Sequence, residues 1–293
     1  MQTWQSPHGR PLPLIGSRTL VMGVLNLTPD SFSDGGQLAT THSVVERAGQ
    51  MIEAGADVLD LGGESTRPGA ASVSAEEELA RVLPAIAAVH AAWPQIPLSI
   101  DTYKPAVAAA AIAAGADIIN DIWGGAHGFT SEERRENTPH RASTMAETAA
   151  RLRCPLILMH NRPACDYGDF WADVLRDLQL SLALARAAGV EDRQIWLDPG
   201  FGFAKEPAQN LEVLKHLDRI VALGRPVLVG TSRKSTIGRV LGATVDQRLE
   251  GTGATVVWAI QQGARMIRVH DVAEMVRFAR MADAINAGIT FPC

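Results

Sequence analysis

Residues 21–36, which read Val-Met-Gly-Val-Leu-Asn-Leu-Thr-Pro-Asp-Ser-Phe-Ser-Asp-Gly-Gly, contain the signal that decides the fold. The segment from Leu20 to Leu25 is apolar enough to form a strand buried on both faces. At Asn26 the sequence turns polar, and the glycine pair at 35–36 interrupts any regular element. Connections between a strand and a helix usually have about 2 to 6 residues. The stretch from Asn26 to the helical pattern near Thr41 is longer, which favours a functional loop.

The composition is that of a globular protein with a full hydrophobic core. The chain has 293 residues and a formal net charge of −5, with 46% hydrophobic and 5% aromatic residues. Acidic and basic residues are interspersed, so we expect no basic face of the kind that binds a nucleic acid backbone. A single α/β barrel uses about 250 residues, and no break in composition divides this chain.

The sequence carries no signal for secretion, a membrane span, a disulfide framework or a zinc site. Residues 1–17 lack the continuous apolar segment of a signal peptide, and no run reaches the roughly 18 apolar residues of a membrane helix. Cys154, Cys165 and Cys293 are odd in number and have no metal-ligand spacing. We therefore expect a cytoplasmic protein with reduced thiols.

Short apolar runs alternate with longer stretches of helical period along the whole chain. The predicted strands are Leu20–Leu25, Val58–Leu61, Leu98–Ile100, Ile118–Ile119, Leu156–Met159, Ile195–Leu197, Val227–Val229 and Met266–Val269. The predicted helices cover about residues 41–54, 74–92, 104–114, 143–152, 170–188, 207–222, 246–262 and 271–287. This alternation predicts an α/β protein with a (β/α)8 TIM barrel as its single domain, with an open doubly wound sheet as the alternative. We expect residues 1–17 to be an N-terminal extension, such as a hairpin, that closes the bottom of a barrel formed by residues 18–293.

Polar side chains follow every predicted strand. In chain order they are Asn26; Glu64, Ser65, Thr66 and Arg67; Asp101; Asn120 and Asp121; His160; Asp198; Ser232, Arg233 and Lys234; and Arg268 with His270. The carboxyl ends of parallel strands form the rim of one pocket, so these residues should converge. One polar residue after a strand is usually a helix cap, but capping does not account for the whole set.

Two groups of rim residues differ in the ligand that they suit. Asp101, Asn120 and Asp198 emerge directly from apolar strands and suit a planar heterocycle with several N–H donors, held deep in the pocket. The other group is cationic or becomes so on protonation, and it suits a phosphate or diphosphate; its members are Arg67, Arg268 and His270. Asn26 is an oxygen ligand that suits the Mg²⁺ commonly bound with a diphosphate.

Structural interpretations of the same residues stay open at this point. Asp101 could cap the following helix, and Asp198 could belong to a turn. We interpret His160 as a satisfied structural group and leave it out of the predicted catalytic set. Lys234 follows an apolar strand so closely that we expect it to point inward. The polar stretch 125–142 balances its own charge, and we interpret it as a solvated excursion without chemistry.

Seven motifs along the chain occur in an order that is specific to one enzyme family. They are GVLNLTPDSFSDGG (23–36), DLGGESTRPG (60–69), SIDT (99–102), ND (120–121), DPGFGF (198–203), GTSRKS (230–235) and RVHD (268–271). With these motifs the sequence closely resembles dihydropteroate synthase, from about residue 20 to residue 285. The resemblance implies a (β/α)8 barrel, usually a homodimer. It also implies a transferase that joins p-aminobenzoate to 6-hydroxymethyl-7,8-dihydropterin diphosphate in folate synthesis, releasing diphosphate and 7,8-dihydropteroate.

The resemblance also implies site residues, position by position. The pterin-binding set is Asp101, Asn120, Asp198, Lys234 and Arg268. The set for diphosphate is Asn26, Thr66, Arg67, Arg268 and His270, with Asn26 next to Mg²⁺. The p-aminobenzoate pocket is Phe32, Asp34, Pro68, Phe203 and Ser232, and the loops 27–36 and 66–73 would close over it. The catalytic residues are Lys234, Arg268, Asp101, Asp198 and Arg67.

Rival functions remain at this stage. A pterin-binding methyltransferase barrel shares the heterocycle pocket but handles no diphosphate, and Arg67 argues against it. An aldolase-like barrel would use Lys234 as a Schiff-base lysine, and a pterin-binding paralogue without turnover should have a broken rim. The sequence also departs from the family at Thr236, at Asn161-Arg162-Pro163 and in the long 125–142 stretch, which bears on loop packing more than on the reaction.

Overall fold

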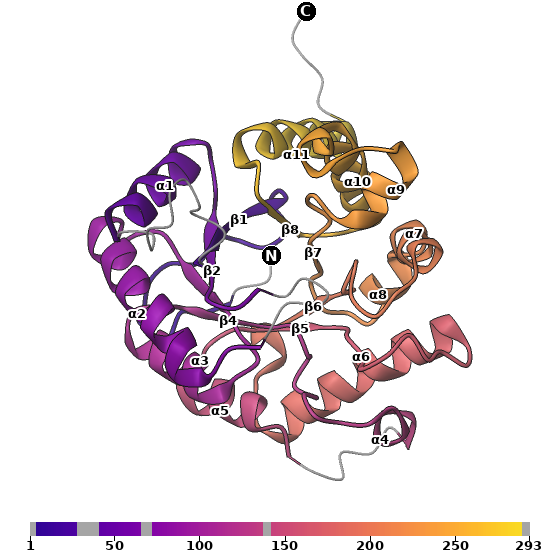
Figure 1. Cartoon of the computed structure of the whole chain (residues 1–293), viewed down its shortest axis with the longest axis horizontal. Coiled ribbons are helices and arrows are strands. Elements are labelled where there is room, and N and C mark those ends of the chain that lie inside the picture. Colours follow the sequence, from indigo (N-terminus) through magenta and orange to yellow (C-terminus); the bar gives the residue numbers. More distant parts are fainter. Residues whose placement is uncertain (1–3, 28–40, 66–71, 137–141, 289–293) are drawn as a thin grey trace, which may run out of the picture.

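The computed structural model describes residues 4–27, 41–65, 72–136 and 142–288, and in them eight parallel strands form a barrel inside a ring of helices (Figure 1). The strands are β1 (Leu20–Asn26), β2 (Val58–Gly62), β3 (Leu98–Asp101), β4 (Ile118–Asp121), β5 (Leu156–Met159), β6 (Ile195–Asp198), β7 (Leu228–Val229) and β8 (Met266–Val269). Their order is β6-β5-β4-β3-β2-β1-β8-β7. A parallel bridge between Leu197 and Val227 joins the two edge strands. The predicted TIM barrel is therefore confirmed.

The helices follow the predicted pattern with three differences. They are α1 (Thr41–Glu53), α2 (Ala75–Ala92), α3 (Pro105–Ala113), α4 (Ser131–Glu136), α5 (Thr144–Leu152), α6 (Phe170–Ala187), α7 (Pro207–Lys215), α8 (Asp218–Val221), α9 (Ser235–Leu241), α10 (Leu249–Gln261) and α11 (Val272–Ala287). The single helix predicted over 207–222 is wrong, because the backbone leaves helical geometry at His216. The short helices α4 and α9 were not predicted. Within the described ranges, no helix is long and apolar enough to cross a membrane.

Side chains inside the barrel follow the two-residue period of the strands. Along β1, Leu20 and Met22 belong to the interior cluster, whereas Val21 and Leu25 pack against the helices. The interior cluster gathers the first apolar positions of the strands, and its members are Trp4, Ile15, Leu20, Met22, Val58, Ile118, Ile157, Trp196, Leu228 and Met266. Because alternate residues share a face, the same parity turns the later polar positions of each strand toward the barrel axis.

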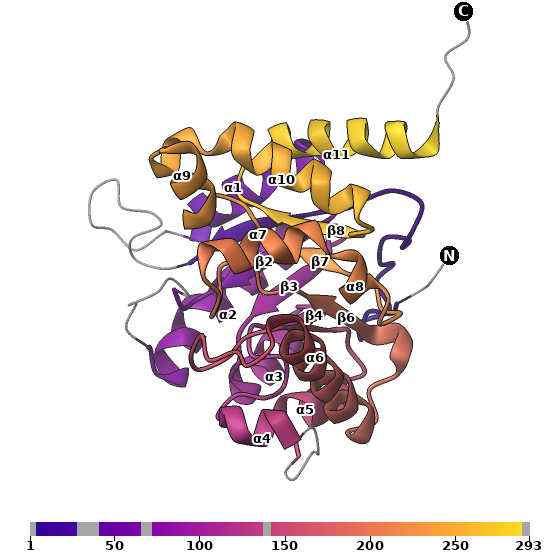
Figure 2. The same cartoon turned by 90° about the vertical axis from the view of Figure 1, so that its right-hand side faces the viewer.

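The N-terminal segment lies against the end of the barrel where the strands begin, on the right in Figure 2. Trp4 packs against Trp196 of β6 in a tilted arrangement with ring centroids 4.9 Å apart, and both side chains are buried. Arg10 pairs with Asp117, which directly precedes β4. These contacts place residues 4–17 as an apolar and ionic cover for the barrel core.

Part of the 125–142 stretch is buried, which corrects the interpretation of a fully solvated excursion. Ala126 and Phe129 form a small core with Leu180 and Leu184 of α6. The Arg134 side chain is 1% exposed, and its Nη2 donates to the Ala126 carbonyl over 2.8 Å. The balanced charge of the sequence did not reveal this packing, because the carboxylates that act electrostatically on the buried Arg134, those of Asp121 and Asp177, lie outside the stretch.

Candidate active site

The strand ends bring four polar or glycine positions into one row across the barrel. Asn26 on β1 is the register partner of Gly62 on β2, which pairs with Asp101 on β3, and Asp101 pairs with Asn120 on β4. A cavity adjoins this row, and it is lined by Asp101, Asn120, Ile122, Met159, Asp198, Phe201, Phe203, Gly230, Lys234 and Arg268. The structure thus brings together all five residues of the predicted pterin set, while their binding role stays a prediction.

Arg268 lines this cavity and is held in place by two carboxylates. Its Nε lies 2.5 Å from Asp60 Oδ2, and its Nη2 lies 2.7 Å from Asp101 Oδ2. Asn120 Nδ2 donates to the same Asp60 oxygen over 3.1 Å. Sequence reasoning missed Asp60 as a site residue, although its position in β2 puts it on the inner face, two residues after Val58. A carboxylate inside an otherwise apolar strand is the signal that marks it.

Some buried carboxylate oxygens at or beside this cavity have no hydrogen-bond donor among the described residues. Asp60 Oδ1 and Asp101 Oδ1 are both buried and have no partner among the described residues. Asp198 accepts one bond, from the Gly200 N–H to Oδ1 at 2.7 Å. A buried acceptor without a donor is costly, so these oxygens suit a ligand that presents several N–H groups. Burial raises the pKa of Asp101 to about 7 and that of Asp198 to about 6.

Lys234 reaches the cavity from the loop after β7, as predicted from its place in the sequence. Arg233 has a left-handed backbone with φ +60°, after which Lys234 begins the turn into α9. The Nζ atom lies 4.1 Å from the centroid of the Phe203 ring. Gly202 lets the lysine stem pass, because a Cβ there would lie 3.0 Å from Lys234 Cδ. Burial, reinforced by Arg268, lowers the pKa of Lys234 to about 8.

Ser232 and His270 hold each other at the rim. Ser232 Oγ lies 3.0 Å from His270 Nδ1 and also accepts the His270 backbone N–H over 3.1 Å. Burial and the charge of Arg268 lower the pKa of His270 to about 3. In this structure His270 is therefore a neutral hydrogen-bonding group, whereas the sequence grouped it with the potential cations.

The residues present fit a magnesium ion only if the ligand supplies most of its shell. Asn26 is half-buried at the end of β1, and its side chain has no partner in the part of the chain that the structure describes. The same part contains no group of three or more His, Cys, Asp or Glu side chains that could hold a metal. One amide oxygen with phosphate oxygens and water is a shell that Mg²⁺ accepts.

The remaining predicted site residues belong to two loops. They are Phe32, Asp34, Thr66, Arg67 and Pro68. All of them lie outside the described residues, and so does most of the two stretches, 27–36 and 66–73, that were expected to close over the site. Their roles remain expectations of the sequence.

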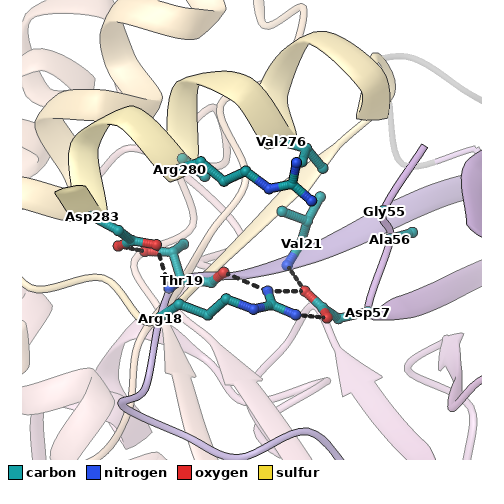
Figure 3. Close-up of a pocket in the computed structure, with 10 residues that line it drawn as sticks. Arg18, Thr19, Val21, Gly55, Ala56, Asp57, Val276, Arg280 and Asp283 are labelled. Carbon is teal, nitrogen blue, oxygen red and sulfur yellow. Dashed lines mark hydrogen bonds and ion pairs between the residues drawn. The ribbon is translucent and has the colours of Figure 1, made fainter. Parts of the chain in front are cut away.

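A larger cavity, of about 190 Å³, lies at the opposite end of the barrel, where β1 and β2 begin (Figure 3). Its carboxylates are already engaged: Arg18 makes a bidentate pair with Asp57, and Asp283 accepts from the N–H and the hydroxyl of Thr19. The rim cavity is smaller. The converging unpaired acceptors, and not the cavity volumes, identify the rim as the candidate active site.

Buried carboxylate oxygens that lack a donor among the described residues lie beside Lys234 and Arg268 at the carboxyl ends of this (β/α)8 barrel, and such a site suits an enzyme of the pterin-binding class. The family described as "Pterin binding enzyme" matches residues 22–270. The dihydropteroate synthase of Bacillus subtilis is 47% identical over 283 residues, which cover 96% of this chain and 94% of that protein. The chain belongs to the dihydropteroate synthase family.

Solved structures agree with this assignment. The dihydropteroate synthase of Clostridium difficile in the presence of pteroic acid is similar with a TM-score of 0.85 and 42% identity, covering 94% of this chain and 99% of that one. The Xanthomonas albilineans dihydropteroate synthase with 4-aminobenzoic acid gives a TM-score of 0.84 and 43% identity, covering 97% and 99%.

Proposed function

We propose that this transferase joins p-aminobenzoate to 6-hydroxymethyl-7,8-dihydropterin diphosphate and releases diphosphate and 7,8-dihydropteroate. The observation that carries the proposal is the cavity in which Asp101, Asn120, Asp198, Lys234 and Arg268 converge. A pterin ring presents amino and ring N–H donors beside a carbonyl and ring nitrogens. The carboxylates match the donors, and the Lys234 ammonium matches the carbonyl.

The chemistry needs stabilisation of separated charge. The C–O bond between the pterin methylene and the diphosphate breaks, and its electron pair leaves with the oxygen while the ring delocalises the cation. Asp101 and Asp198, when ionised, hold the ring N–H groups and favour the cationic form. Closely placed carboxylates act strongly here because the site is buried and water is scarce.

Cations at the rim would neutralise the departing diphosphate. Arg268 is 20% exposed in its side chain, so its guanidinium borders both the pterin cavity and the solvent side. His270 would donate as a neutral imidazole, and Thr66 and Arg67 would contribute from the loop outside the described residues. Asn26 would hold Mg²⁺, which when bound supplies positive charge to the phosphate oxygens.

The second substrate needs positioning more than activation. The amine of p-aminobenzoate is already a neutral nucleophile, so it attacks the methylene and then loses a proton to water without a dedicated base. Phe203 lies at the cavity wall next to Lys234 and would pack on the benzoate ring, with Ser232 near the same side. Phe32, Asp34 and Pro68 would complete this pocket from the two loops.

Release of diphosphate tests the proposal directly. We would mix the protein with the dihydropterin diphosphate and Mg²⁺, with and without p-aminobenzoate, and measure diphosphate and dihydropteroate. We expect release that p-aminobenzoate strongly increases, with one dihydropteroate formed per diphosphate. Binding of the pterin diphosphate without coupled product would contradict the proposed reaction.

The family also leads us to propose a homodimer, and an apolar surface supports it. Large hydrophobic side chains are exposed on the neighbouring helices α9, α10 and α11 and on the turn between α9 and α10; they are Val240, Leu241, Val245, Trp258, Met281 and Ile285. These helices lie side by side in Figures 1 and 2. Exposed apolar side chains gathered on one face are typical of an interface, and a second copy of the chain is the occupant that we propose.

A further inference from the structure

Lys205 is a buried lysine that no part of the proposed reaction uses. It lies between β6 and α7, and its side chain is enclosed although the residue is in a loop. Its Nζ has three neighbours at hydrogen-bond distance: His160 Nδ1 at 2.8 Å, the Gly200 carbonyl at 3.1 Å and the Phe203 carbonyl at 3.2 Å. An ammonium group has three donors, so each donor has one acceptor.

His160 is fixed as the acceptor for Lys205 by the groups on its other side. His160 Nε2 lies 3.3 Å from Asp177 Oδ2, which also accepts from Arg162 Nε over 2.6 Å. The carboxylate favours a proton on Nε2, which leaves Nδ1 free to accept. Burial lowers the pKa of Lys205 to about 7 and that of His160 to about 3, so near neutral pH the proton between them belongs to the lysine.

The two carbonyls that Lys205 binds belong to the loop that carries the site. Gly200 donates its N–H to Asp198 Oδ1, and Phe203 lines the same cavity and faces Lys234. Gly200 has φ +67°, and a Cβ there would lie 1.9 Å from the His160 carbonyl oxygen. The loop is therefore held from two sides, by the end of β5 and by the lysine ammonium.

We propose that Lys205 is a positioning residue of the reaction: backed by His160 and Asp177, it clamps the 200–203 backbone and so sets Phe203 for p-aminobenzoate. Arg162 donates from Nε to Asp177 Oδ2 and so helps to hold Asp177 in this role. The proposal rests on the proposed placement of the two substrates. It assigns a function to His160 that the sequence interpretation, a satisfied structural group, did not include.

A matched pair of substitutions separates the two ring contacts of His160, the one with Lys205 and the one with Asp177. Asparagine places a side-chain oxygen near the position of Nδ1 and keeps an acceptor for Lys205, whereas glutamine places its amide near Nε2 and keeps the contact with Asp177. We expect His160→Asn to leave the KM for p-aminobenzoate within about twofold of the parent. His160→Gln should raise it about tenfold, the loss typical of one unmet buried hydrogen bond, with kcat changed less.

Removal of the Lys205 ammonium tests directly whether this group positions the 200–203 backbone. Lys205→Met keeps the length of the side chain and loses all three bonds, and Lys215→Met, at an exposed lysine of α7, is the matched control. We expect a rise of ten- to a hundredfold in the KM for p-aminobenzoate in the first variant only. Binding of 6-hydroxymethylpterin, measured by titration calorimetry, should weaken by less than threefold, because the pterin set stays in place.

The outcomes distinguish this inference from the proposed function. Asp198→Asn should lose pterin binding. Normal pterin binding in that variant would contradict the proposed placement of the pterin, but not the positioning role of Lys205. Equal KM values for p-aminobenzoate in His160→Asn and His160→Gln would overturn the positioning role. So would a Lys205→Met protein that is folded and has the kinetics of Lys215→Met.

Discussion

Arg268 and Asp60 join two strands across the strand that separates them. Both β8 and β2 pair with β1, and the 2.5 Å contact from Arg268 Nε to Asp60 Oδ2 spans β1 inside the barrel. Asp60 is fully buried and also accepts from Asn120. One carboxylate thus orients both an amide and a guanidinium that the proposed reaction needs, and it holds Arg268 at the wall of the rim cavity.

Asp60→Asn should impair turnover without changing the fold of the barrel. The substitution keeps the volume of the side chain, but it leaves the Arg268 guanidinium with one paired carboxylate in place of two. We expect kcat/KM for the dihydropterin diphosphate to fall by about 10- to 100-fold, which corresponds to roughly 1.4 to 2.7 kcal/mol. Steady-state kinetics with circular dichroism as a check of folding would measure it.

Ser99→Ala is the control for this variant. Ser99 is fully buried on β3, and its hydroxyl has no partner among the described residues, so its removal should be nearly neutral. If the two variants have the same kcat/KM within twofold, Asp60 has no role in setting the site.

Activity should depend on pH on both sides of neutrality. The carboxylates must be ionised to hold the cationic ring, and burial raises their pKa values to about 7 for Asp101 and about 6 for Asp198. Activity should therefore be lost as the pH falls through this range. Lys234 must be protonated to donate, and burial lowers its pKa to about 8, so activity should also be lost as the pH rises above that value.

The pH profile of kcat/KM for the pterin substrate between pH 5 and pH 9.5 checks this expectation. The pterin-binding constant measured over the same range should follow the same two limbs, because all three groups contact the proposed pterin. Circular dichroism at each pH shows whether the fold is retained. A flat profile from pH 5.5 to pH 9 would exclude these three groups as the titrating residues.

The sequence predicted the barrel and the convergence of the deep residues at one cavity, because both follow from the order and parity of the strands, while the pterin-binding role of these residues stays a prediction. The direction of a side chain can be predicted where a strand has apolar residues at its early inward positions and polar residues at its last ones. Met266, followed by Arg268 and His270, is an example. Asp60 also occupies an inward position of its strand. Because it lies within an apolar run and inside a longer motif, the sequence analysis did not single it out as a site residue. Lys205 could not be found in this way, since it lies in a loop and its three partners come from two different segments.

The free energy of unfolding should depend more on Asp117 than on Asp57, although the two carboxylates make similar contacts. Each carboxylate accepts a backbone N–H of the preceding strand and pairs with an arginine from the N-terminal segment. Asp117 and its partner Arg10 are almost fully buried, with 0% and 5% of their side chains exposed, whereas Arg18, the partner of Asp57, is 50% exposed. A buried pair that loses one member costs far more than an exposed one.

We expect Asp117→Asn to lower the free energy of unfolding by about 3 kcal/mol and Asp57→Asn by about 1 kcal/mol or less. Urea unfolding followed by fluorescence would give both values. The two variants are controls for each other, because each retains an oxygen for the strand N–H. A larger loss in Asp57→Asn would contradict the stabilising role given to the N-terminal cover.

The apolar face of α9 to α11 should control self-association. Met281 and Ile285 are 63% and 59% exposed on α11, and Trp258 is 47% exposed on the neighbouring helix α10. A glutamate at Met281 would have to be desolvated in a dimer but would remain hydrated in a monomer. We expect Met281→Glu to weaken association by about 100-fold, roughly 2.7 kcal/mol, in sedimentation velocity over a range of concentrations.

Leu14→Glu is the matched control for the dimer, because Leu14 is 50% exposed in the N-terminal segment, outside α9 to α11. It should leave the sedimentation coefficient of the parent unchanged. Since the proposed active site is built from one chain, Met281→Glu should also retain kcat when assayed as a monomer, which separates assembly from chemistry. A parent protein that sediments as a monomer at all concentrations, or a Leu14→Glu variant that dissociates in place of Met281→Glu, would show that this face is not the interface.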